Sequence, residues 1–185
     1  MARNIVALFY DEAEKRSADE RRHWFTKGLK LLYASAFQDA LDALTTAIQI
    51  DPERAEAYAY RGFAYHQLEN YDAALKDYNK SVEQRPKLVE GYYFRAILYG
   101  QHKEHEKAIN DYSRAIELEP TLAEAYYFRA LNYGATGRYE EAIKDMKTAA
   151  ELGHELAKEF LRVNEPDQGE TNPDLQRCSE DSGRS

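Results

Sequence analysis

Apolar residues recur along this chain at intervals of four and three, the spacing that places side chains on one face of an α-helix. In one segment a large, a small and a large residue stand at Tyr58, Gly62 and Tyr65. The same series stands at Trp24/Gly28/Leu31, Tyr92/Ala96/Tyr99 and Tyr126/Ala130/Tyr133. A second spaced series follows each of these, at Ala40/Leu44/Ala47, Ala74/Tyr78/Ser81, Ala108/Tyr112/Ala115 and Ala142/Met146/Ala149. The pattern predicts pairs of amphipathic helices.

The pairs are copies of one 34-residue unit, since Pro52, Pro86 and Pro120 are 34 residues apart. Four units follow, over residues 21–54, 55–88, 89–122 and 123–156, and we count the place of a residue from the first residue of its unit. The small residue at place eight lets the two helices of a unit approach closely, and the proline ends the second helix. Because one helix pair cannot bury both of its faces, the units are expected to stack.

The first unit carries Trp24-x-x-Lys27-Gly28-x-x-Leu31, followed by Ala40, Leu44, Ala47 and Pro52, and this pattern resembles the tetratricopeptide repeat. The resemblance covers residues 21–156 and implies an all-α fold, a right-handed α-solenoid of four helix-turn-helix units with a C-terminal capping helix. The glycine that the family has between its two helices appears only as Gly137, with Ser35, Glu69 and Lys103 in the other units. The last unit has His154 in place of the proline. We expect these departures to alter turn geometry and to leave the fold intact.

The two ends divide the chain into three parts. Residues 1–16 form an N-terminal extension in which Ile5, Phe9 and Ala13 have helical spacing, so a short helix and disorder both stay open. Residues 17–162 form the array, with Ser17 and Glu20 as a capping box at its start.

At the C-terminal end, Gly153 should stop the last helix of the fourth unit. A final helix over residues 155–162 should then cover the end of the stack with Leu156, Phe160 and Leu161. Residues 163–185 form an acidic tail that is expected to be disordered.

Charged residues recur within the units at places seven and twenty-three. Three units carry Arg and Asp there, and the pairs are Arg61 with Asp77, Arg95 with Asp111, and Arg129 with Asp145. An ion pair between the two helices of each hairpin is the structural interpretation, since an unpaired, partly buried charge would be costly. A role of these residues in binding a ligand is the alternative. The first unit has Lys27 and Ala43 at these places, and we expect no pair there.

Composition excludes several classes of function. Lys and Arg number 25 against 33 Asp and Glu, a net charge of −8 that argues against binding of nucleic acid. The single cysteine, Cys178, fits a reducing compartment and excludes a disulfide framework. No apolar run approaches the roughly 20 residues of a membrane-spanning helix, so no membrane insertion is expected. The expectation is a cytoplasmic protein.

Catalytic motifs and metal-ligand sets are not found in the sequence. Two histidines, His102 and His105, are close enough to share a metal, but no third ligand accompanies them, and we interpret both as residues of a solvated turn. No phosphate-binding loop, metalloprotease motif or nucleophile motif occurs. We therefore predict no enzymatic activity, no metal and no cofactor.

The resemblance implies that the first helices line a concave groove that holds a peptide or a helix of a partner. Carrying its places two, five and nine over to this sequence gives an apolar and aromatic groove with an acidic edge. The predicted groove residues are Phe25, Leu29, Glu56, Phe63, Glu90, Tyr93, Ile97, Glu124, Tyr127 and Leu131.

Chaperone-binding members of the family hold a C-terminal carboxylate with a clamp of Lys, Asn and Arg. This sequence has apolar, aromatic or acidic residues at those places, including Glu90 and Glu124 in the two possible registers, so binding of that motif is not expected. The preferred partner is a hydrophobic segment that carries Lys or Arg. A groove occupied by residues 1–16, and a groove with no ligand, both stay open.

Three functions follow from these observations. The favoured one is a non-enzymatic scaffold or adaptor that binds a partner peptide or helix in its groove. The alternatives are a self-assembling scaffold that uses residues 1–16 to form homo-oligomers, and a chaperone for a secreted or membrane-associated protein.

Overall fold

The computed structural model describes residues 19–164, and all regular structure within that range is helical. A helix covers residues 19–33 at the start of the described part. The helices that follow are α2 (Phe37–Ile50), α3 (Ala55–Gln67), α4 (Tyr71–Gln84), α5 (Val89–Gln101), α6 (His105–Leu118), α7 (Ala123–Ala135), α8 (Tyr139–Glu151) and α9 (Glu155–Asn164). The predictions for the extension, for the capping box at Ser17 and for the tail after Asn164 lie outside the described residues.

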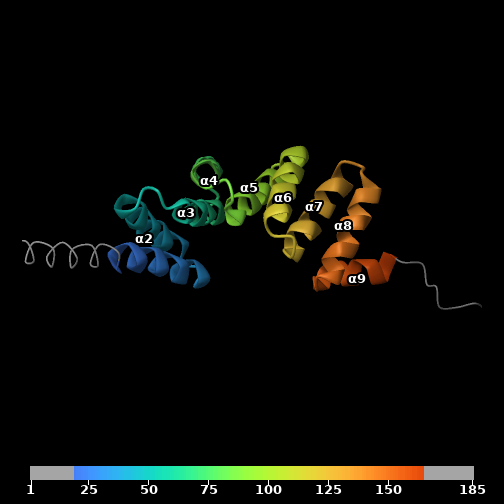
Figure 1. The fold of residues 1–185 in the computed structure, drawn as a ribbon, viewed down its shortest axis with the longest axis horizontal. Helices are drawn as coiled ribbons and strands as arrows, with labels where there is room; N and C mark the ends of the chain where they lie inside the picture. The colour runs from blue at the N-terminus through green and yellow to red at the C-terminus, as the bar shows by residue number, and fades with distance from the viewer. Residues whose placement is uncertain (1–18, 165–185) are drawn as a thin grey trace, which may run out of the picture.

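The helices stack as four antiparallel pairs in chain order, which confirms the predicted all-α solenoid (Figure 1). Helices α3, α5 and α7 each begin at place one of a unit, at Ala55, Val89 and Ala123. Each packs against the second helix of its own unit and against the second helix of the unit before. The core therefore runs through the array as a chain of small clusters, as stacked repeats require.

Small residues at place eight allow the two helices of a unit to approach closely. A Cβ atom added at Gly62 would lie 2.7 Å from the Tyr78 ring, and one added at Gly28 would lie 2.6 Å from Leu44. Tyr78 and Leu44 are fully buried at place twenty-four. The large residue of the second helix thus fills the space that the small residue of the first helix leaves.

The turns between the two helices of a unit share one geometry, contrary to the expectation from sequence. Ser35, Glu69 and Lys103 have positive φ angles of 57°, 58° and 62°, and Gly137 at the same place has 78°. In each turn two backbone N–H groups donate hydrogen bonds to carbonyl groups of the last helical turn. Asn70 N, for example, donates to Tyr65 O at 2.9 Å. Three exposed non-glycine residues therefore take the left-handed conformation, at a cost of about 1 kcal/mol each, in turns that backbone hydrogen bonds close.

The connection from α8 to α9 differs from the connections between the other units. Gly153 has a φ of 99°, and His154 N donates to Ala149 O at 2.9 Å, so this link has the tight geometry used inside the units. The predicted stop at Gly153 agrees with α8 ending at Glu151. Without the proline, α9 starts earlier than a fifth unit would and folds directly back onto α8.

The capping helix differs from its prediction in two respects. Ala157 and Leu161 pack onto the last core cluster, whereas Leu156 is 62% exposed and Phe160 is 38% exposed, so these two residues do not cover the end of the stack. Of the three predicted residues, Leu161 joins the cluster, together with Ala157 four residues earlier, whereas Leu156 and Phe160 are each turned about 100° from this buried face. The helix also includes Val163 and Asn164, which the sequence assigned to the tail.

None of the helices within residues 19–164 combines the length and the apolar character that crossing a bilayer requires.

Candidate functional site

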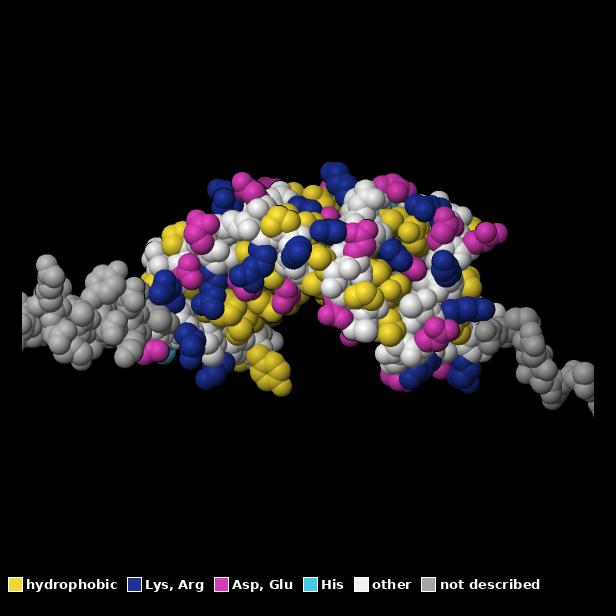
Figure 2. Space-filling view, viewed as in Figure 1, with side chains coloured by type: hydrophobic (Ala, Val, Ile, Leu, Met, Phe, Trp, Pro, Cys, Tyr) yellow, Lys and Arg dark blue, Asp and Glu magenta, His cyan; other side chains and the backbone are white. Residues whose placement is uncertain are grey.

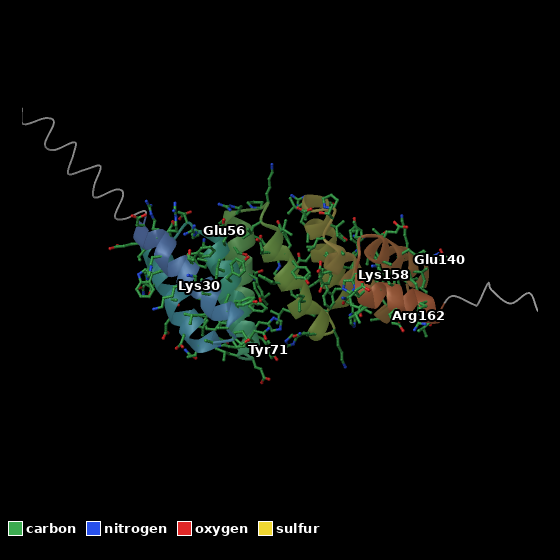
Figure 3. All side chains as sticks on the ribbon, turned by 90° about the horizontal axis from the view of Figure 1, so that it is seen from below. Lys30, Glu56, Tyr71, Glu140, Lys158 and Arg162 are labelled. Carbon is green, nitrogen blue, oxygen red and sulfur yellow. The ribbon has the colours of Figure 1, made fainter. Side chains whose placement is uncertain are left out.

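The first helices of the units form the inner wall of the array. Helix α3 contacts α5, and α5 contacts α7, while the second helices of the described units are not joined by contacts of this extent. The array is accordingly an arch that is hollowed on one side, where hydrophobic and acidic side chains both reach the surface (Figure 2). We call this hollow the groove. Seen from below, Lys30 and Glu56 lie toward one end of it, and Lys158 and Arg162 toward the other (Figure 3).

A line of aromatic rings follows the groove from the first unit to α9. Phe25 contacts Tyr60 with ring centroids 6.0 Å apart, and Tyr60 contacts Phe94 at 5.8 Å. The line continues from Tyr93 to Phe128 at 6.4 Å. These distances are typical of favourable edge-to-face pairs.

The line ends where Tyr127, which contacts Phe128 at 5.4 Å, stacks on His154 at 4.2 Å. Because ring contacts cross each of the three unit boundaries and neighbouring rings within a unit also touch, as Tyr93 and Phe94 do at 5.8 Å, the groove wall is one connected surface.

Half of the six rings from Phe25 to Tyr127 were not among the predicted groove residues. Tyr60, Phe94 and Phe128 stand at place six, whereas the predicted groove residues stand at places two, five and nine. The available signal was the repetition of aromatic residues at place six in three units. The first unit has Thr26 there, and its predicted residue Phe25 makes the ring contact instead.

The predicted apolar residues lie along the same wall, mostly half-buried. Phe25, Leu29, Phe63, Tyr93, Ile97 and Tyr127 are partly covered, and Leu131 is 46% exposed. Some of the cover comes from neighbouring helices: Phe63 contacts Phe94 at 5.2 Å, and Tyr93 contacts Tyr112 at 6.1 Å. These residues therefore shape the wall and also present part of their surface to the groove.

The predicted acidic edge has two members whose charge is open to a ligand. Glu56 forms an ion pair with Arg85, which follows α4. The next unit has Glu119 at the place of Arg85, and so the second acid, Glu90, has no equivalent arginine. Glu124, the third, is exposed. The negative potential of the groove is thus concentrated on α5 and α7.

Two tyrosine hydroxyls lie close to these acids. Burial raises the pKa of Tyr60, and the negative charges of Glu90 and Glu56 raise it further. Burial and the charge of Glu124 raise the pKa of Tyr93 to about 12. Both hydroxyls therefore stay protonated at neutral pH and can donate hydrogen bonds beside the carboxylates.

The Arg and Asp residues at places seven and twenty-three are in contact in all three units that carry them. Arg95 Nε and Nη2 lie 2.7 and 2.8 Å from the two carboxylate oxygens of Asp111. The other two pairs have the same bidentate geometry, with Nε to Oδ2 distances of 2.7 Å from Arg61 to Asp77 and 2.6 Å from Arg129 to Asp145. Bidentate pairing is the strong form of this interaction.

The aspartates of these pairs are more deeply buried than the sequence analysis expected. It interpreted them as partly buried charges, whereas Asp77, Asp111 and Asp145 are buried, with exposed fractions of 4%, 8% and 5%. Asp145 lies on α8 in the last unit, and Arg129 Nε and Nη2 occupy both of its carboxylate oxygens. Both oxygens of Asp145 are thus paired and its surface is largely covered, whereas Asp77 and Arg61 are among the residues that line a surface pocket between α3 and α4. The bidentate pairing and the burial of the aspartates favour the structural interpretation of these pairs.

Each of these arginines also binds the unit before its own. Arg61, Arg95 and Arg129 donate from Nη1 to Thr45, Asn79 and Ser113 at 3.3, 2.7 and 2.9 Å. The guanidinium groups lie over flanking tyrosines as well, as Arg95 does over Tyr92 and Tyr99 at 5.7 and 5.9 Å. With these contacts the arginines tie three helices together on the side of the first helices that faces away from the groove.

The two neighbouring histidines have different partners. His102 contacts the Tyr71 ring edge-on at 4.7 Å, and His105 Nδ1 is hydrogen-bonded to Asn132 Oδ1 at 2.9 Å. Within residues 19–164 no three His, Cys, Asp or Glu side chains are grouped as metal ligands. Both rings serve the packing of helices against one another.

Several solved structures share this architecture. A crystal structure of MamA is 26% identical, covers 80% of this chain and 87% of its own, and superposes with a TM-score of 0.66. The first tetratricopeptide repeat domain of Spaghetti (RPAP3), bound to the HSP90 peptide SRMEEVD, is 25% identical, with 64% of this chain and 94% of that chain covered and a TM-score of 0.61. Pseudomonas aeruginosa PilF, at 18% identity over 74% of this chain and 63% of its own, shares the fold with a TM-score of 0.69. No curated protein matches the chain.

Family models of the tetratricopeptide repeat match residues 55–88, 89–122 and 123–152, which are the second, third and fourth units apart from the last residues of the fourth. The first unit, which lacks the pair of Arg and Asp, is not matched, yet Gly28 of its first helix lies against Leu44 of its second, as Gly62 lies against Tyr78 in the next unit. With most of its array matched and its helices stacked in pairs of this length, the chain belongs to the tetratricopeptide repeat family.

Proposed function

We propose that this chain is a non-enzymatic scaffold whose groove binds a segment of a partner protein. The observation that carries the proposal is the connected line of half-buried aromatic rings from Phe25 to Tyr127 on the inner wall. Aromatic side chains with part of their surface exposed and little freedom to move are the residues that dominate protein interfaces. A wall that is already ordered lowers the entropic cost of binding on the side of the scaffold.

The charge of the groove defines the chemistry of the partner. Glu90 and Glu124 face a segment that lies on α5 and α7, while Glu56 is already paired with Arg85. A hydrophobic segment with at least one Lys or Arg complements this surface, and long-range attraction speeds its encounter. The domain of Spaghetti binds a peptide with two glutamates and a terminal aspartate, a chemistry opposite to the one proposed for this groove.

The experiment that tests the proposal is an affinity capture from a cell lysate with matched variants. Tyr93→Ala with Tyr127→Ala removes two rings of the wall, and Tyr139→Ala, at a residue of α8 that is 70% exposed, serves as the control. Proteins captured by wild type and by the control but not by the double variant support the groove. Equal capture by all three contradicts it.

The tested rings also contact core residues, so a second variant protects the test against loss of folding. Glu124→Lys with Leu131→Ser changes two exposed residues of the groove. Circular dichroism should show unchanged helicity for this variant. If its captured proteins are those of wild type, the proposal fails even if the tyrosine variant is unstable.

Self-assembly and chaperone activity remain alternatives from sequence. The first uses residues 1–16, which lie outside the described part of the chain, and no contact within residues 19–164 favours either one. Deleting residues 1–16 and measuring the molar mass by light scattering tests self-assembly, which predicts a shift from oligomer to monomer.

A further inference from the structure

A pocket opens in the groove wall between α5 and α7. Its volume is about 250 Å³, and it is lined by Ile97, Gly100, Gln101, His105, Tyr112, Phe128, Leu131 and Asn132. Pockets that hold drug-sized ligands measure about 300–1,000 Å³, so this one suits a single side chain better than a small molecule.

The pocket arises from two differences between neighbouring units. At the junction of α3 and α5, place nine is Phe63, whose ring lies 5.2 Å from the Phe94 ring. Place twelve of the same unit is His66, which is buried and hydrogen-bonded to Gln101 at 2.6 Å. At the junction of α5 and α7 these places hold Ile97 and Gly100, and the smaller side chains leave the space open.

Three polar side chains that line the pocket, those of Gln101, His105 and Asn132, form hydrogen bonds within the protein. His105 Nδ1 is bonded to Asn132 Oδ1 at 2.9 Å, and Asn132 Nδ2 donates to Phe128 O at 2.8 Å. The side-chain oxygen of Gln101 is bonded to His66. The surface left for a ligand is therefore formed mainly by Ile97, Phe128 and Leu131, which favours an apolar side chain.

We infer that this pocket receives one large apolar side chain, Leu, Ile, Met or Phe, of the basic segment that binds in the groove. The inference rests on the proposed function of the groove and adds the position of its anchor. The open acids stand at place two of the same helices, seven residues from Ile97 and Leu131, which is about 10 Å along a helix. The anchor and a Lys or Arg of the partner are thus about 10 Å apart, the span of three residues in an extended segment or seven in a helix.

The test uses peptides selected from a random library displayed on phage against the full chain. Enriched peptides are synthesised with a fluorescent label and titrated against wild type and two variants. Ile97→Phe fills the pocket with the residue that the preceding unit carries at that place, and Ile143→Phe makes the same change at a residue of α8 that is 40% exposed. We expect Ile97→Phe to weaken binding about tenfold or more, the effect of excluding one large apolar side chain, and Ile143→Phe to have no effect.

A double-mutant cycle separates the pocket from general damage. Replacing the apolar anchor of the peptide by Ala should weaken binding to wild type but cause little further loss with Ile97→Phe. Independent, additive losses would overturn the inference. If binding requires Glu124 and Leu131 but tolerates Ile97→Phe, the inference about the pocket is wrong and the proposed groove stands. If the peptides bind the Glu124→Lys/Leu131→Ser variant and wild type with equal affinity, or if the selection enriches no sequence, both the pocket and the groove proposals are wrong.

Discussion

Arg95 Nη1 donates a hydrogen bond of 2.7 Å to Asn79 Oδ1 across the boundary between the second and third units. The other edge of the same guanidinium holds both carboxylate oxygens of Asp111. One side chain on α5 therefore links its own unit to the unit before. The repetition of this contact by Arg61 and Arg129 makes it a regular element of the stacking.

Replacing Arg95 and replacing its partner Asn79 should have unequal effects on stability. Arg95→Ala leaves the carboxylate of Asp111, which is 8% exposed, without its counter-ion, and we expect a loss of about 3–5 kcal/mol in the free energy of unfolding. Asn79→Ala removes one hydrogen bond from an exposed residue, and we expect a loss of about 1 kcal/mol or less. Urea unfolding followed by circular dichroism measures both, and equal losses would contradict the ranking.

Two glycines close together in sequence should respond to alanine in opposite directions. Gly137 has a φ of 78°, so Gly137→Ala should destabilise the protein by about 1–2 kcal/mol. Gly134 lies inside α7, and a Cβ atom added there would meet no other atom within 4 Å. Gly134→Ala should therefore stabilise the protein by up to about 1 kcal/mol, because alanine favours the helix. Thermal unfolding of the two variants is the measurement. Unchanged or higher stability of Gly137→Ala would contradict the expected cost of a left-handed alanine, and lower stability of Gly134→Ala would contradict the helix argument.

The buried hydroxyl of Tyr78 has no hydrogen-bond partner among the described residues. Tyr78→Phe keeps the ring against Gly62 and removes a desolvated polar group, so we expect a gain of about 1 kcal/mol in stability. Denaturant unfolding tests this, and a clear loss would mean that the hydroxyl is satisfied by a bound water.

Stability should fall at alkaline pH because of the buried tyrosines. The folded pKa of Tyr93 is about 12, whereas an unfolded tyrosine has a pKa of about 10, and burial raises the pKa values of Tyr78 and Tyr112 in the same direction. Below about pH 10 these hydroxyls are protonated in both states, and their contribution is constant. As the pH rises further, the unfolded chain releases protons that the folded protein keeps, so the free energy of unfolding decreases.

Urea midpoints at about pH 9 and about pH 11 measure this decrease. The decrease should become smaller in Tyr78→Phe and Tyr93→Phe, which remove groups that ionise only in the unfolded chain. A decrease of the same size in both variants would assign the effect to other residues.

The groove should reject the acidic peptide bound by the Spaghetti domain. Glu90 and Glu124 oppose the glutamates of SRMEEVD, so we expect a Kd weaker than about 1 mM. The same peptide with both glutamates replaced by lysine should bind more tightly, and salt should reduce that gain. Fluorescence anisotropy compares the two, and tighter binding of the acidic form would reverse the proposed charge preference.

Much of the fold and part of the groove could be predicted because they follow from local periodicity. The large and small residues at places four, eight and eleven specify a helix face whatever lies around it, and a 34-residue period carries one interpretation through four units. Predicting Arg61 with Asp77 needed only the geometry of one hairpin, because both residues face each other within a unit. Predicting Tyr93 and Ile97 on the inner wall needed only the family pattern.

Other features depend on three-dimensional contacts of individual side chains and turns, and the repeat pattern does not contain them. Lys103 takes a left-handed φ of 62°, a conformation that its residue type does not favour. The pairing of Glu56 with Arg85 removes one acid from the groove, and it has no counterpart in the next unit, where Glu119 stands in place of the arginine. The aromatic line needs Phe94 to reach across a boundary, and the pocket needs the space that Ile97 leaves beside α7.

The sequence by itself determined that this protein is a stack of four helix pairs, because repeated apolar spacing dictates helices that cannot bury their faces alone. Only the tertiary structure decided which charges of the groove stay open, which rings join into one wall and where a cavity remains. It also decided how deeply a paired charge such as Asp145 is buried, since the covering side chains come from neighbouring helices. Those properties arise from distances between side chains of different helices and units, which vary with side-chain size and pairing even while the repeat stays the same.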